Sequence, residues 1–236
     1  LTLEEIETGL EDPAQELADM CLDLAADVVN SEELLEALAI PPLFWDMVRD
    51  SWQRNEPSLY GRFDLAYDGH GPAKLYEYNA DTPTALYEAA YFQWLWLEDR
   101  IKDGALPEDA DQFNSIHERL VETFAGFGVS GLMHFASMKD SEEDRATVEY
   151  LMDCARQAGI DGRQIYMEDI GVDSQGVVVD PDDQAIHRLF KLYPWELMWN
   201  DEYAPLLPKC DTTFVEPAWK MVLSNKGILP LLWERH

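Results

Sequence analysis

The chain has 236 residues, and its 17 lysines and arginines against 47 aspartates and glutamates give a formal net charge of −30. Such a charge repels phosphate backbones and anionic lipid headgroups, so it argues against nucleic-acid and membrane partners and favours cationic ligands and divalent metals. A hydrophobic share of 47% with 11% aromatic residues excludes a disordered acidic tail, which would lack the apolar surface that folding needs. The acidic surplus is also explained by the salt or pH in which a source organism lives. The net charge is therefore no evidence for a function by itself, and only acidic residues that lie together in a site are.

The first helices are predicted from apolar residues that recur at helical spacing. Over residues 3–29 this spacing predicts two helices or one kinked helix, since Pro13 suits the first turn of a new helix. Ser31 is predicted to cap a short helix, and residues 43–52 form another amphipathic helix after a Pro-Pro pair. We interpret all of these helices as scaffold.

The segment from residue 61 to 81 changes character. Its two halves alternate between polar and apolar residues around the sequence Asp68-Gly-His-Gly-Pro72, a pattern that predicts two strands joined by a short turn. The remainder of the chain predicts helices at 84–102, 112–127, 142–158 and 182–193, helical segments at 194–199 and 217–232, and short strands at 128–137, 164–167 and 177–179. Strands that alternate with helices indicate an α/β layered domain with a mixed sheet flanked by helices.

Three cysteines, Cys21, Cys154 and Cys210, are widely spaced and form no C-x-x-C pair. This pattern fits neither a zinc site nor a disulfide framework, and it favours a reducing, cytoplasmic location. No run of about eighteen apolar residues and no basic segment before an apolar stretch is present, so we expect neither a membrane span nor a signal peptide. Both ends fall within helical patterns, which suggests a part of a longer protein.

The predicted hairpin carries the strongest chemical signal. A turn centred on Gly69-His-Gly71 sets Asp64 opposite Glu77 and Arg62 opposite Asn79. These four side chains then share one face, while the opposite face carries Phe63, Leu65, Tyr76 and Tyr78. Two opposed carboxylates repel each other unless a cation lies between them, and with an amide oxygen they form a ligand set that suits Mg²⁺. An adjacent arginine suits a phosphoryl or carboxylate group. The alternative is a solvated polar face with an ordinary cross-strand Arg–Glu pair.

Five strings extend this signal along nearly the whole chain: SLYGRFDLAYDG, KLYEYNADTPTALYEAAYFQWLWLED, DQFNSIHERL, LFKLYPWELMW and VEPAWKMVLSNKGILPLLWE. Together they resemble the synthetase portion of glutathionylspermidine synthase and its stand-alone bacterial relatives, which are ATP-grasp ligases. The resemblance implies a pre-ATP-grasp, acceptor-binding domain over residues 1–210 and the start of an ATP-grasp module over residues 211–236. It also implies ATP and Mg²⁺ as cofactors, with a peptide acid such as glutathione and a polyamine such as spermidine as substrates joined through an acyl phosphate.

The same resemblance assigns roles to the hairpin residues. Arg62 corresponds to the arginine that faces the transferring phosphoryl group. Asp64, Glu77 and Asn79 correspond to the ligands of two Mg²⁺ ions, with Glu77 between them. The charge stabilisation that acyl phosphate formation needs agrees with this assignment.

The resemblance also assigns roles to residues outside the two strands. Thr82 and Thr84 replace a Ser-x-Ser at the peptide-substrate end, and Lys226 resembles the first nucleotide-contacting lysine. Glu142 and Glu143 are candidates for binding the amine. Lys226 is alternatively a lone basic residue that balances local acids, and the two glutamates are alternatively helix-start acids that interact with the helix dipole.

The rest of an ATP-grasp module is missing after Lys226, so we expect this segment alone to be inactive. Two hypotheses from other classes remain open: a non-catalytic module of the same fold that captures a metal or a polyamine, and an acidic structural domain without a site. Six tryptophans are predicted to lie in the core: Trp94, Trp96, Trp195, Trp199, Trp219 and Trp233. Cys154 is predicted to be a small core residue.

Overall fold

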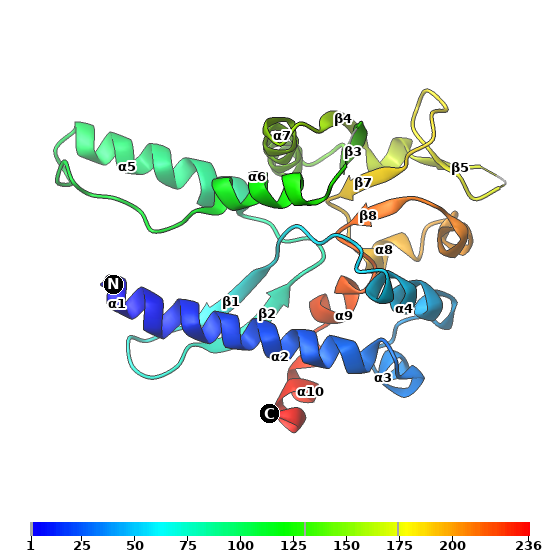
Figure 1. Cartoon of the computed structure of the whole chain (residues 1–236), viewed down its shortest axis with the longest axis horizontal. Coiled ribbons are helices and arrows are strands. Elements are labelled where there is room, and N and C mark those ends of the chain that lie inside the picture. Colours follow the sequence, from blue (N-terminus) through cyan, green and yellow to red (C-terminus); the bar gives the residue numbers. More distant parts are fainter. Residues whose placement is uncertain (1, 130, 174) are drawn as a thin grey trace.

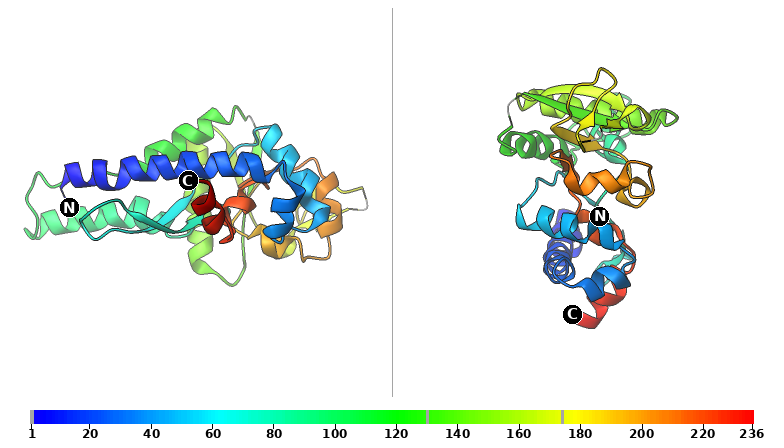
Figure 2. Two further views of the ribbon diagram at one scale, coloured as in Figure 1. Left: turned by 90° about the horizontal axis from the view of Figure 1, so that it is seen from below. Right: turned by 90° about the vertical axis from the view of Figure 1, so that its right-hand side faces the viewer.

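The computed structural model describes residues 2–129, 131–173 and 175–236 and shows two lobes (Figure 1). One lobe holds a four-stranded sheet with helices α5 to α7. The other holds the N-terminal helices, a two-stranded hairpin and the C-terminal helices. The right-hand view of Figure 2, turned by 90° about the vertical axis, shows the two lobes stacked on each other. Among the described residues, no helix combines the length and the apolar character needed to cross a membrane.

The lobe that contains the N-terminus begins with one continuous helical rod over residues 3–28. Glu11 precedes the Asp-Pro pair and keeps helical backbone angles, so Pro13 lies in the first turn without interrupting the rod. Ser31 caps the next helix as predicted, since its hydroxyl accepts a hydrogen bond from the Leu34 N–H at 3.3 Å. The elements of this lobe in chain order are α1 (Leu3–Ile6), the π-helical turn η1 (Glu7–Glu11), α2 (Asp12–Val28), α3 (Glu32–Ala37), the short η2 (Pro42–Phe44) and α4 (Trp45–Gln53).

The central sheet is parallel, with strand order β4-β3-β7-β8. Its strands are β3 (Leu132–Ser137), β4 (Asp161–Tyr166), β7 (Arg188–Lys191) and β8 (Thr213–Val215). Met133 and Phe135 on β3 belong to a core formed with α6 (Ile116–Gly126) and α7 (Glu142–Gln157). Ala136 and Leu189 belong to the opposite core, which they share with α2. Helices therefore cover both faces, as parallel sheets require, and the predicted α/β layered architecture is confirmed.

The C-terminal third differs from its sequence-based prediction. Residues 182–193 were expected to be helical, but β7 lies within them, and β8 was not expected at all. Both are short, fully covered strands, so their sequences lack the polar–apolar alternation that identifies a strand. The predicted helix at 217–232 is interrupted around Asn225. The elements after β7 other than β8 are α8 (Trp195–Met198), η5 (Ala204–Lys209), α9 (Lys220–Ser224) and α10 (Ile228–Arg235).

Helix α5 (Gln93–Lys102) extends from the π-helical turn η3 (Glu88–Phe92) as an arm beyond the sheet (Figure 1). Only Leu97 is buried on α5, and the side chains of Trp94 and Trp96 are 42% and 59% exposed. Trp233 on α10 is 87% exposed, whereas Trp195 and Trp219 are buried. The prediction of six core tryptophans was therefore wrong for these three, because no element in the described part of the chain covers the faces that carry them.

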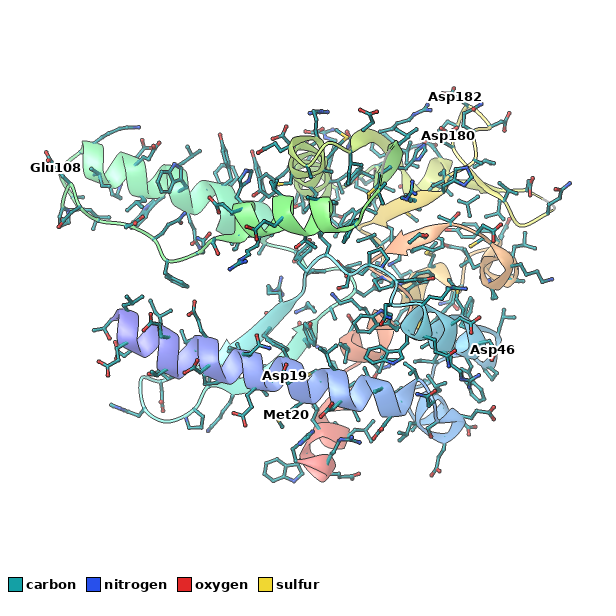
Figure 3. All side chains as sticks on the ribbon, viewed as in Figure 1. Asp19, Met20, Asp46, Glu108, Asp180 and Asp182 are labelled. Atoms are coloured by element: carbon teal, nitrogen blue, oxygen red, sulfur yellow. The ribbon has the colours of Figure 1, made fainter. Side chains whose placement is uncertain are left out.

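The remaining elements are a short antiparallel pair, β5 (Gly171–Val172) and β6 (Val178–Val179), and the turn η4 (Met167–Asp169). Cys154 is fully buried on α7, as predicted. The labelled acids in Figure 3, which include Asp19 on α2, Asp46 on α4 and Glu108 beyond α5, lie on distant elements. Much of the negative charge is therefore spread over the surface, so net charge alone does not locate a site.

Candidate active site on the β1–β2 hairpin

The hairpin consists of β1 (Arg62–Ala66) and β2 (Lys74–Asn79), paired antiparallel. Arg62 lies opposite Asn79 and Asp64 opposite Glu77, which is the register predicted from the turn. Gly69 and Gly71 have φ values of +83° and +79°, a conformation that glycine adopts without the steric cost of a side chain. The local sequence thus sets the register, and the register brings four polar side chains to one face.

The apolar face differs from the prediction at one position. The register shifts between Asp64 and Leu65, so that Leu65 pairs with Leu75 and Tyr76 has no opposing residue. Phe63 and Tyr78 contact each other with ring centroids 4.2 Å apart and ring planes tilted by 43°, and both pack on the core, as expected. Tyr76 is 68% exposed, because a bulge turns the extra residue out of the regular alternation.

A buried glutamate holds the segment that enters β1. Glu216 is fully buried, and its carboxylate accepts hydrogen bonds from the Ser58 hydroxyl at 2.8 Å and from the backbone N–H groups of Leu59 and Tyr60 at 3.0 Å. Lys220 donates to the same carboxylate at 2.9 Å. Glu216 follows β8 directly, so this cluster fixes the start of β1 against the edge of the central sheet.

A second buried ion pair holds the end of β2. Asp81 accepts hydrogen bonds from the Lys191 ammonium and from the Trp195 N–H, each at 2.7 Å. The Ser224 hydroxyl accepts from the backbone N–H groups of Ala80 at 3.0 Å and Asp81 at 2.7 Å. Lys191 is fully buried, and that burial lowers its pKa against the opposing effect of Asp81. Both ends of the hairpin are therefore anchored to rigid elements, which is what a preorganised site requires.

On the polar face, Arg62 is held by partners on two sides. Its guanidinium donates to the two Asp64 carboxylate oxygens at 2.8 and 3.3 Å. It also donates to the backbone oxygen and the hydroxyl of Thr84, both at 3.0 Å. The hydrogen bond to Asp64 is the main reason that the pKa of Arg62 is raised. The planar cation is thus permanently charged and fixed in orientation.

Glu77 forms an ion pair with Lys226, a contact that the sequence did not predict. The Lys226 ammonium lies 2.7 Å from one Glu77 oxygen, and the Asn79 amide N–H donates to the other at 2.8 Å. These contacts, with Lys226 first, lower the pKa of Glu77, and the same pair raises the pKa of Lys226. The two opposed acids are therefore each neutralised, Asp64 by Arg62 and Glu77 by Lys226. No local pattern signals this contact, because Lys226 lies far along the chain.

The donor set on this face fits Mg²⁺ by its chemistry. Asp64 and Glu77 supply carboxylate oxygens, and the amide oxygen of Asn79 remains available because its N–H group makes the contact to Glu77. Mg²⁺ is commonly held by one or two carboxylates with help from substrate phosphates. Within residues 2–129, 131–173 and 175–236, no three His, Cys, Asp or Glu side chains form a metal-binding group.

Comparison with known proteins identifies the family. The sequence profile described as "Glutathionylspermidine synthase preATP-grasp" matches residues 1–236. The chain belongs to this family. It is 45% identical over 240 residues to a Haemophilus influenzae protein assigned as an acid–amine ligase, covering 100% of this chain and 59% of that protein.

More distant relatives include two longer synthetases. The identity is 28% over 247 residues to trypanothione synthetase from Crithidia fasciculata, covering 94% of this chain and 37% of that enzyme. It is 27% over 259 residues to the bifunctional glutathionylspermidine synthetase/amidase of Escherichia coli, covering 98% of this chain and 40% of that enzyme. The chain thus spans less than two thirds of the length of each of these relatives. The division at residue 210 that we expected stays a prediction.

The other candidate residues of this pre-ATP-grasp chain lie in two places. Thr84 contacts Arg62, and half-buried Thr82 belongs to the same loop, which the Tyr60 hydroxyl holds by donating to the Pro83 oxygen at 2.8 Å. Glu142 and Glu143 are exposed in the first turn of α7, away from the hairpin contacts. That turn is capped by Ser141, whose hydroxyl accepts from the Asp144 N–H at 3.1 Å. Interaction with the positive end of the helix dipole explains Glu142 and Glu143 without a ligand.

Two cavities flank the segment that follows β2, and sequence reasoning found neither. A cavity of about 480 Å³ is lined by Arg62 and Thr84. A second cavity of about 710 Å³ lies between η3, α6 and α7, and Asn114 lines both. The second cavity combines aromatic rings with acids: Tyr87, Tyr91, Trp94 and Tyr150, with Asp111, Glu118, Glu149 and Asp153. Among the described residues that line it, none is a lysine or an arginine.

Proposed function

We propose that this chain forms the acid-activating part of an ATP-dependent carboxylate–amine ligase. The observation that carries the proposal is the grouping of five side chains on one side of an anchored hairpin: Arg62, Asp64, Glu77, Asn79 and Lys226. Phosphoryl transfer depends mainly on positioning and charge stabilisation, and this group supplies two cations and hard oxygen donors. Relatives named as ligases and synthetases support the same class of reaction.

The reaction has two steps. In the first, a carboxylate oxygen of the acid bonds to the γ-phosphorus of ATP, the bond to the bridging oxygen breaks, and ADP leaves. In the second, the amine nitrogen bonds to the acyl carbon, phosphate leaves, and the nitrogen loses a proton. Negative charge gathers on the phosphoryl oxygens during the first step, so a guanidinium that faces them lowers the barrier. Asp64 and Thr84 already hold Arg62 in orientation, which reduces the reorganisation needed at that moment.

In this proposal the acids of the polar face change their cationic partners when ATP binds. Asp64, Glu77 and Asn79 would hold Mg²⁺, which neutralises charge on phosphate oxygens. The Lys226 side chain is 77% exposed, so it is free to leave Glu77 and to contact the phosphates of a bound nucleotide. In this proposal Lys226 keeps Glu77 neutralised until ATP arrives and then contributes to ATP binding.

The amine is proposed to enter from the second cavity, which is lined by aromatic rings and acids. An organic ammonium ion is attracted by carboxylates and by the faces of aromatic rings, and that cavity offers both. Glu142 precedes Ala146 by four positions and Glu149 by seven, which places it near the middle of the face of α7 that lines the cavity, whereas Glu143, seven positions before Tyr150, lies at the edge of that face. Among the two glutamates first considered for the amine, Glu142 is therefore the better candidate. A polyamine such as spermidine fits this description, and the name of the Escherichia coli relative, a glutathionylspermidine synthetase/amidase, points to glutathione as the acid in that enzyme.

A non-catalytic module is the second candidate, because the chain holds only part of its relatives' length. Calorimetry separates the two. A binding module takes up Mg²⁺ or spermidine with the same affinity whether or not a nucleotide is present. A ligase site binds Mg²⁺ weakly alone and more tightly with ATP, since phosphate oxygens complete the coordination.

The decisive experiment measures ADP release by the full-length protein with ATP, Mg²⁺, an acid and an amine. We expect ADP release that requires the acid and amide product that requires both substrates. Arg62→Ala should reduce the rate about 10²-fold. Arg49→Ala is the matched control, since Arg49 also pairs with an aspartate, at 2.7 Å, and its side chain is 27% exposed against 34% for Arg62. Equal rates for the two variants would refute the proposal.

A further inference from the structure

The cavity beside Arg62 lies between the two lobes. Its walls come from the segment that enters β1, from the turn after β2, from α6 and from Glu11 of the N-terminal rod. Arg62 and Thr84 are among the residues that line it. If the acid is activated in front of Arg62, the remainder of the acid must extend into adjacent space, and this cavity of about 480 Å³ adjoins Arg62 directly.

The walls of this cavity are mostly apolar. They include Leu59, Leu86, Ala89, Ile116 and Leu120. Leu59, Leu86 and Leu120 are buried, so these walls are also part of the packed core and keep their shape. An apolar wall binds methylene groups and leaves buried amides or amines without hydrogen-bond partners, which costs binding free energy.

One further cation lines the same cavity. Arg119 projects from α6, where its guanidinium pairs with Glu122 at 3.1 Å, one helical turn away, and its side chain is 76% exposed. An exposed pair of this kind is weak, so it competes poorly with a ligand carboxylate that binds a guanidinium in bidentate geometry. Among the described residues that line the cavity, Glu11 is the one acid, against two arginines, Arg62 and Arg119.

We propose that this cavity selects an acid with an apolar body and a second acidic group, the body lying along the leucine and alanine wall and the second carboxylate contacting Arg119. This inference rests on the proposed function and deepens it by naming the class of acid. Glutathione fits this cavity less well, because most of the exposed wall is apolar and offers few hydrogen-bond partners to its two amides and its ammonium group. The reacting carboxylate then lies at Arg62 and the second one at Arg119.

The test compares two series of acids with the full-length protein, with ADP release measured in the presence of ATP, Mg²⁺ and spermidine. One series is adipate, suberate and sebacate, and the other is hexanoate, octanoate and decanoate. We expect kcat/KM to rise about three- to fourfold for each added methylene until the cavity is filled. We also expect each diacid to exceed the monoacid of the same length by about tenfold or more.

Arg119→Gln should abolish the preference for diacids through a higher KM, leaving kcat and the KM for ATP unchanged. Arg54→Gln is the matched control, because Arg54 also pairs with one nearby glutamate and is 63% exposed. Ala89→Leu, which fills part of the cavity, should shift the best acid to a shorter one. A rate that is independent of acid length, a diacid preference that survives Arg119→Gln, or glutathione exceeding every diacid would overturn the inference. The proposed function would survive those results provided that ADP release still required an acid and Arg62.

Discussion

Lys191→Met is the perturbation that best tests how the site is held. The substitution keeps an unbranched side chain of similar length and removes the charge. The Lys191 ammonium is fully buried, donates to Asp81 at 2.7 Å and to the Tyr193 oxygen at 2.9 Å, and lies 4.6 Å from the centre of the Trp195 ring. After the substitution, the Asp81 carboxylate would remain buried with the Trp195 N–H as a donor but without its cation.

The expected loss follows from that geometry. Removing one partner of a buried ion pair leaves an uncompensated charge, which typically costs about 3–5 kcal/mol of unfolding free energy. For a domain of this size each kcal/mol shifts the melting temperature by about 2–4 °C, so Lys191→Met should lower it by roughly 6–20 °C. In the double variant Asp81→Asn/Lys191→Met both charges are gone and the Asn oxygen still accepts from Trp195, so most of the stability should return.

The assay is thermal unfolding followed by near-ultraviolet circular dichroism, because buried Trp195 reports on the packing beside the pair. Asp81→Asn alone completes the double-mutant cycle, and we expect a coupling of about 2 kcal/mol or more. If Lys191→Met destabilises by less than about 1 kcal/mol, or if the double variant is less stable than either single variant, then the pair does not anchor the end of β2 as argued.

The remaining predictions concern catalysis and pH. Arg62→Ala in the full-length protein should lower kcat about 10²-fold with little change in the KM for ATP. Arg62→Lys should recover only a small part of that rate, since lysine lacks the planar fork of the guanidinium. If steady-state kinetics instead showed a higher KM for the acid at constant kcat, Arg62 would bind the acid in the ground state and would not stabilise the transition state. Glu77→Gln should leave folding intact and lower the rate more than about threefold, which acid-dependent ADP release would measure. Burial lowers the pKa of His134 despite its contact with Asp180, so the folded state favours the neutral ring. Its contribution to stability is present above about pH 6.5 and is lost as the pH falls from there toward the folded-state pKa, with a slope of at most about 1.4 kcal/mol per pH unit. Denaturant unfolding at pH 7 and pH 5.5 should therefore show a smaller difference for His134→Gln than for the unmodified protein.

Local sequence was sufficient where the structure is set by neighbours in the chain. The hairpin register follows from the glycine turn and from the alternation on each side of it, so the facing positions of Asp64 and Glu77 were predictable. The Ser31 cap was predictable for the same reason, since donor and acceptor lie within one turn. Tyr76 was misplaced because a bulge changes the alternation without a clear local signal.

Which side chains and strands are buried could not be predicted from the local sequence. Trp94 and Trp96 have the composition of core residues, yet α5 extends away from the sheet and no described element covers them. The strands β7 and β8 are three or four residues long and covered on both faces, so their apolar runs resemble short helices. In both cases the missing information is what packs against the segment, which a single stretch of sequence does not contain.

By itself the sequence determined the α/β class, the hairpin and the polar face that carries Arg62, because hydrophobic periodicity and turn chemistry act over a few residues. Only the tertiary structure decided how that face is neutralised and held. Lys226 pairs with Glu77, Lys191 with Asp81, and Glu216 binds the backbone before β1. These contacts join residues far apart in the chain, and a charged side chain is buried only where folding brings its partner to it. The cavity beside Arg62 arises likewise from surfaces that meet when the two lobes pack.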